Sequence, residues 1–196
     1  MAATAGLQAA SITVTNRLAA TLDSNWIAND AGEFIANGTG VVAIGSFSDE
    51  AGIGTATSAD ALLSAFTQFG GSVSVAGVGT VAGLYANSIT ASVSDGGFTD
   101  QSVYTIVGNG DTLTSSTEAL VFRHDGVFPA DADNPTASLN AIVGTGNGEL
   151  LRGGMGTGDF NGNAINTFRT TPFIPEPSSA LLGLIGLSFL AFRRRK

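Results

Sequence analysis

Residues 102–107 read SVYTIV and residues 119–123 read ALVFR, and these two stretches decide the fold. Both are short and rich in β-branched and aromatic residues, and turn-forming residues such as Asn109-Gly110 lie between them. The pattern recurs on both sides, so further strands are predicted at 11–15, 41–47, 72–75, 80–86, 88–94, 139–143 and 149–152. Short strands at such spacing predict a mainly β body, an antiparallel β-sandwich or a barrel-like structure.

One α-helix is predicted within this body, which is expected to span residues 12–171. Thr57 and Asp60 fit a capping box, in which a hydroxyl and a carboxylate satisfy the exposed amides at a helix start. Apolar residues then recur at helical spacing up to Gly70-Gly71, and these are Leu62, Leu63, Phe66 and Phe69. We expect this stripe to pack against a sheet.

The chain is acidic, with 16 Asp and Glu against 8 Lys and Arg. Four of the basic residues close the chain, so the body is still more acidic than the formal net charge of −8 at pH 7. Such a charge argues against nucleic acid and anionic lipid as partners of the body. The chain has no cysteine, which excludes thiol chemistry and disulfides.

The C-terminal tail has three parts. A linker at 172–177 carries Pro175, Glu176 and Pro177, and residues 178–192 read SSALLGLIGLSFLAF without a charge. As a helix this segment would reach roughly 22 Å, short for a membrane span. The alternative is a soluble amphipathic helix, but the segment has no polar face beyond scattered serines. We therefore expect a transmembrane helix at 178–192.

A basic cluster follows the apolar segment at once, and it consists of Arg193, Arg194, Arg195 and Lys196. Basic residues beside a membrane segment favour the cytoplasmic side, so the body is expected outside. Long basic side chains also reach the headgroups, which offsets some of the shortness of the helix. Residues 193–196 are thus predicted to be a cytoplasmic tail.

This arrangement resembles the PEP-CTERM sorting signal of exported bacterial proteins, and the resemblance covers residues 175–196 only. It implies an exosortase-type membrane peptidase as partner and a transient tether in the inner membrane. It also implies processing near the Pro-Glu-Pro motif, after which the body reaches the cell surface or the extracellular matrix of a biofilm. Residues 1–11, MAATAGLQAAS, are expected to be the remnant of a signal peptide whose basic start lies upstream, or else an ordinary flexible terminus.

The residues offer little for catalysis, and neither a catalytic site nor a cofactor is expected. His124 is the single histidine and is interpreted as a solvated loop residue. Residues 153–166 are rich in glycine and asparagine and are expected to form a loop. Weak calcium candidates in it are Asp159, Asn161 and Asn163, which alternate like the ligands of an EF-hand loop. Ala164 stands where the loop glycine belongs, so no firm metal site is predicted.

The expected function is therefore that of a non-enzymatic surface or matrix protein delivered by its tail. Its body would be structural or adhesive, with exopolysaccharide as a partner. One alternative is a secreted glycan hydrolase that uses two carboxylates. Another is an envelope protein that stays anchored in the membrane.

Overall fold

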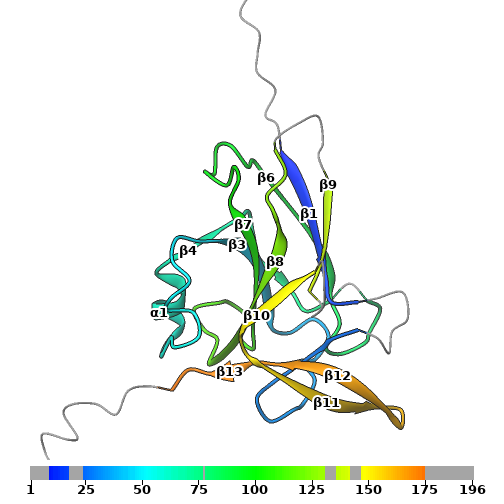
Figure 1. Ribbon diagram of the computed structural model, residues 1–196. Coiled ribbons are helices and arrows are strands. Elements are labelled where there is room, and N and C mark those ends of the chain that lie inside the picture. Colours follow the sequence, from blue (N-terminus) through cyan, green and yellow to red (C-terminus); the bar gives the residue numbers. More distant parts are fainter. Residues whose placement is uncertain (1–8, 18–23, 77, 131–135, 142–146, 175–196) are drawn as a thin grey trace, which may run out of the picture.

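The computed structural model describes residues 9–17, 24–76, 78–130, 136–141 and 147–174 (Figure 1). This part of the chain is mainly β, as predicted. Its elements are β1 (Ala10–Thr15), β2 (Trp26–Ala28), β3 (Val41–Phe47), α1 (Ala59–Leu63), β4 (Phe66–Gln68), β5 (Val73–Ser74), β6 (Ala86–Ala91), β7 (Ser102–Gly108), β8 (Glu118–Val127), β9 (Thr136–Asn140), β10 (Gly148–Arg152), β11 (Gly154–Phe160), β12 (Asn163–Arg169) and β13 (Thr171–Pro172).

The largest sheet has the order β10-β8-β7-β3-β4, and all its neighbours are antiparallel. The two stretches that predicted the fold form its centre, where Ile106 of β7 lies opposite Val121 of β8. Two short strands extend the sheet, because β13 pairs with β8 and β5 pairs with β3. Strands β10 and β13 thus follow one another along the same edge of β8.

Two smaller sheets complete the described part, and both contain a parallel pair. Strand β1 lies between β6, which is antiparallel to it, and β9, which is parallel. The third sheet has the order β11-β12-β2, with β12 and β2 parallel. All three sheets are open rather than closed into a barrel. The expectation of a wholly antiparallel body is wrong in these two pairs, which join segments distant in the chain and therefore need no hairpin.

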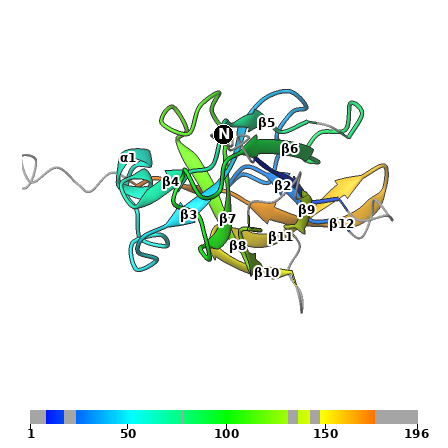
Figure 2. The same ribbon diagram turned by 90° about the horizontal axis from the view of Figure 1, so that it is seen from above.

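The large sheet is covered on both faces, which Figures 1 and 2 show as α1 on one side and β1 with β9 on the other. The main core joins the large sheet to β1 and β6 through buried residues that include Ile12, Ile89, Val42, Val107 and Phe122. A second cluster on the opposite face includes Phe47, Ile53, Leu62, Ile106 and Val121. Because both faces are covered, every residue of β3 is buried.

The predicted helix is much shorter than expected. Ser58 rather than Thr57 is the N-cap, and its Oγ accepts a hydrogen bond of 3.0 Å from the amide of Ala61. The helix ends at Leu63, and Phe66 begins β4 opposite Phe47. A Cβ on Gly45 would lie 2.5 Å from the Phe66 ring, so this glycine makes room for the ring on the sheet. The helical spacing at Phe66 was therefore misleading.

Residues 80–86 do not form the predicted strand, whereas the strand predicted at 88–94 is present as β6. A buried asparagine holds this stretch in place of a strand ladder. The side chain of Asn16 donates to the carbonyls of Gly83 and Asn25, both at 2.8 Å, and accepts from the amide of Tyr85 at 2.7 Å. A side chain thus satisfies main-chain groups that pairing would otherwise have satisfied.

The loop predicted at 153–166 is wrong, because β11 and β12 form a hairpin there. Asn161 and Gly162 make its two-residue turn with positive φ angles of 53° and 79°, as a turn of type I′ requires. The glycines that suggested a loop have a packing role. A Cβ on Gly156 would lie 2.4 Å from Nε of Arg169, and one on Gly158 would lie 2.7 Å from the Phe34 ring. A larger residue at either position would have to displace one of these side chains.

Candidate functional site

The body ends at Phe173, directly before the predicted sorting motif. Thr171 and Pro172 pair with Ala119 and Glu118 of β8. The amide of Phe173 donates to the carbonyl of Thr117 at 2.9 Å, and its half-buried ring packs on the second core cluster. Ile174 is 72 % exposed. One residue therefore separates the packed body from Pro175.

Arg152 holds this end of the chain. It is 4 % exposed, and its Nη2 donates to the carbonyls of Pro172 at 3.1 Å and Thr171 at 3.4 Å. Its Nη1 lies 3.3 Å from the carbonyl oxygen of Ile53 and 3.4 Å from that of Gly54. The guanidinium carbon lies 4.7 Å from the centre of the Phe173 ring, within the range of a cation–π contact. Burial lowers the pKa of Arg152, but an arginine side chain remains charged in proteins.

The predicted tail residues lie outside the described part of the chain. These are Pro175, Glu176, Pro177, the apolar segment 178–192 and the basic cluster Arg193, Arg194, Arg195 and Lys196. Among the residues that the structure describes, no helix has the length and apolar character to cross a membrane. The transmembrane helix thus stays a prediction. At the other end, β1 begins at Ala10, inside the segment 1–11 that was expected to be a signal remnant.

His124 is not a solvated loop residue, contrary to expectation. It lies within β8, is 3 % exposed, and its Nε2 is 2.8 Å from Oγ1 of Thr105. Its ring meets that of Phe122 edge-on, with centroids 5.0 Å apart. Burial lowers the pKa of His124 to about 4, so the ring is neutral at pH 7. The period-two alternation of Leu120, Phe122 and His124 was the signal that could have placed this residue in the core.

The calcium candidates surround the turn of the β11–β12 hairpin. Asp159, Asn161 and Asn163 are exposed, and Oδ1 of Asp159 accepts a hydrogen bond of 3.1 Å from the amide of Gly162. The described residues contain no group of three or more His, Cys, Asp or Glu side chains arranged to hold a metal ion. The alternating polar residues serve the turn itself, and calcium binding stays a prediction.

The sequence did not predict an ionic cluster that lies at the edge of the second core cluster, next to Tyr104. Arg123 bonds Glu50 at 3.1 Å and Glu149 at 2.6 Å, and the hydroxyl of Tyr104 donates to Glu50. The Tyr104 hydrogen bond, with Arg123, lowers the pKa of Glu50. A glycosidase acid needs the opposite, a raised pKa. The cluster joins three separate segments of the chain, so no local sequence pattern predicts it.

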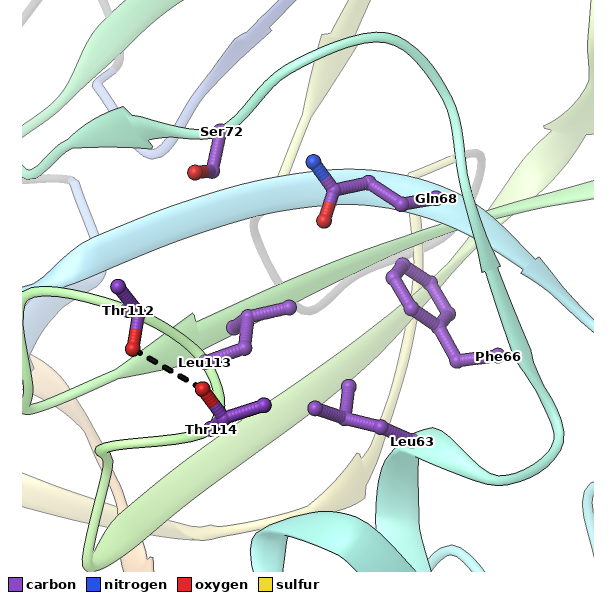
Figure 3. Close-up of a pocket in the computed structure, with 7 residues that line it drawn as sticks. All are labelled: Leu63, Phe66, Gln68, Ser72, Thr112, Leu113 and Thr114. Carbon is purple, nitrogen blue, oxygen red and sulfur yellow. Dashed lines mark hydrogen bonds between the residues drawn. The ribbon is translucent and has the colours of Figure 1, made fainter.

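Two shallow pockets flank the loop between β7 and β8. The larger, of about 280 Å³, has hydroxyl, amide and apolar side chains directed into it, from Leu63, Phe66, Gln68, Ser72, Thr112, Leu113 and Thr114 (Figure 3). The other, of about 270 Å³, lies where the chain leaves the body, since Phe173 lines it together with Asp60 and several Ser and Thr residues. Thr114 lines both. The surface beside the exit thus mixes hydroxyl groups with apolar side chains.

Comparison with known families gives one match, to the family described as PEP-CTERM protein-sorting motif, over residues 173–196. No curated protein and no solved structure matches the chain. The matched segment begins at Phe173, the last described residue that packs on the body. It includes the Pro-Glu-Pro motif, the apolar run and the basic end. The C-terminal tail of this chain is therefore a PEP-CTERM sorting motif, the signal of an exported protein that an exosortase processes.

Proposed function

We propose that the chain is an exported surface or matrix protein that an exosortase-type peptidase separates from its membrane anchor near Pro175, Glu176 and Pro177. One observation carries this proposal. The sorting motif begins at the residue where packing on the body ends, and Ile174 is already exposed. A domain whose packing ends one residue before Pro175 can be delivered in its folded form.

Each part of the tail has its own role in this proposal. Residues 178–192 cross the inner membrane, and the basic cluster at 193–196 keeps the C-terminus in the cytoplasm. Pro175 and Pro177 lack amide donors and favour an extended backbone, so the motif cannot continue a strand ladder. Glu176 lies at the outer interface, where its carboxylate stays hydrated. The enzyme thus meets a stiff and accessible element directly above the membrane.

The body has a structural or adhesive role in this proposal, with no enzymatic activity. Exopolysaccharide is the proposed partner outside the cell. Exposed hydroxyls beside the exit support this choice, because Thr112, Thr114, Ser115 and Thr117 lie on one loop. These hydroxyls already bond within the loop, and each keeps an oxygen exposed that can accept a further hydrogen bond from a sugar. Release of reducing sugars from a panel of polysaccharides would contradict a non-enzymatic body.

Replacement of Glu176 tests the role of the motif. The Glu176→Ala change removes a charge outside the apolar run, so insertion should persist while uncleaved precursor accumulates. Glu33→Ala makes the same change at an exposed position of the body and serves as the control. Membrane and medium fractions are blotted from a host that contains the processing enzyme. Equal amounts of mature protein from the wild type and Glu176→Ala would refute the role of this residue.

Deletion of residues 193–196 should cause a different failure. Loss of the basic cluster impairs orientation or retention in the membrane, since nothing then favours the cytoplasmic side. Protease accessibility of the body in intact spheroplasts reports the orientation. A correctly oriented and normally processed deletion variant would show that the cluster has no such role.

A further inference from the structure

Two sets of contacts hold the last strand of the body, β13, against the rest of the body. Strand β13 pairs with the start of β8, and the amide of Phe173 donates to Thr117. Arg152 adds hydrogen bonds to the carbonyls of Thr171 and Pro172 and covers the Phe173 ring. The same guanidinium is fixed by the carbonyls of residues 53 and 54, in the loop before α1. A buried cation thus ties the exit strand to a distant part of the body.

These contacts occupy groups that a peptidase would otherwise use. An enzyme that binds an extended peptide relies on main-chain hydrogen bonds and on pockets for the side chains. Strand β13 pairs with β8, the carbonyls of Thr171 and Pro172 accept hydrogen bonds from Arg152, and the amide of Phe173 donates to Thr117. The Phe173 ring packs on the second core cluster. Because each residue spans at most about 3.6 Å, Pro175 stays within roughly 7 Å of Phe173. An enzyme that binds residues before the motif therefore meets the body.

We propose that Arg152 is a positioning residue for processing, which keeps β13 and Phe173 on the body until the strand detaches. The strand must then detach before the processing enzyme can bind these residues, so detachment limits the rate of cleavage. This inference rests on the proposed function and adds a regulatory step to it.

A flexible insert between Ile174 and Pro175 tests the proposal without any change to the body. The insert Gly-Ser-Gly-Ser-Gly leaves the distance from the motif to the apolar segment unchanged and supplies extended chain that needs no detachment. The assay follows the initial rate of conversion of full-length precursor in membranes that contain the exosortase. We expect the insert to raise this rate about tenfold, which corresponds to about 1.4 kcal/mol.

Arg152→Met should also raise the rate, because it frees the strand from the guanidinium. In a chain that carries the insert, the same substitution should change nothing further, whereas a merely destabilised body would be affected in both backgrounds. Arg123→Met is the matched control, since Arg123 bonds Glu50 and Glu149 instead of the exit strand. Its rate should equal that of the wild type.

Three results would overturn the inference. The insert could leave the cleavage rate unchanged. It could also lower the cleavage rate, which would mean that the enzyme uses the body as a docking surface. Arg152→Met could change the rate equally with and without the insert. Complete absence of cleavage in the wild type would overturn the proposed function together with the inference. The first two results, in contrast, would overturn the inference alone, because the wild type is still cleaved.

Discussion

Acidification from pH 7.5 to pH 5 is expected to destabilise the body through His124. This residue is the single histidine of the chain, it is 3 % exposed, and burial lowers its pKa to about 4 from an ordinary value of 6.5. Between these two values the unfolded chain binds a proton that the folded chain does not. The free energy of unfolding therefore increases with pH between these two values and decreases as the pH falls.

The size of the effect follows from the two pKa values. Each pH unit below 6.5 lowers the free energy of unfolding by about 1.4 kcal/mol, until the folded state takes up the proton near pH 4. At pH 5 the loss relative to pH 7.5 is about 2 kcal/mol. Glu50 does not contribute in this range, because its pKa is lowered and its stabilisation is lost only below 4.5.

Urea unfolding of the full chain in detergent micelles measures this loss. Trp26 is the single tryptophan and is buried, so its fluorescence reports unfolding of the body. His124→Gln keeps a polar group near Thr105 and removes the titration, so its stability should be independent of pH between 7.5 and 5. A wild-type stability that is equally flat over this range would refute the placement of a neutral histidine in the core.

Two further predictions test the hairpin and the core. Gly162→Val should lower the free energy of unfolding by about 1–2 kcal/mol, because the turn needs a positive φ of 79° at this position and the space around it is otherwise open. Gly71→Val is the control and should be nearly neutral, since Gly71 lies at an open site without a positive φ. Thermal or urea unfolding measures both. Phe122→Ala should lower the free energy of unfolding by about 3–5 kcal/mol, because the Phe122 ring is fully buried. Phe66→Ala should lower it by about half of that or less, because the Phe66 ring is half-buried. Equal costs within either pair would contradict these placements.

The strands rich in β-branched and aromatic residues were predictable, and those built on glycine were not. The stretches SVYTIV and ALVFR became β7 and β8, since packing on both faces suits their side chains. In β11 the glycines accommodate Arg169 and Phe34 from elsewhere in the chain, which composition alone cannot show. Only Asn161-Gly162 announced this hairpin. Likewise, the spacing of Leu62 and Phe66 suits a helix and also a helix followed by a strand.

The candidate site was predictable in its chemistry but not in its connection to the body. The Pro-Glu-Pro motif, the apolar run and the basic cluster are contiguous, so sequence alone identified the sorting motif. The role of Arg152 depends on carbonyls from residues 53–54 and 171–172, which the fold brings together. No local pattern contains that information.

The intact mass of the protein, recovered from cells with and without the exosortase, tests the central claim most directly. With the enzyme, the body should have the mass of a chain that has lost the apolar segment and the basic cluster, plus any group added in transfer. Without it, the protein in the membrane fraction should still carry residues 178–196. A protein that retains these residues in both strains would contradict the proposal that an exosortase processes this chain.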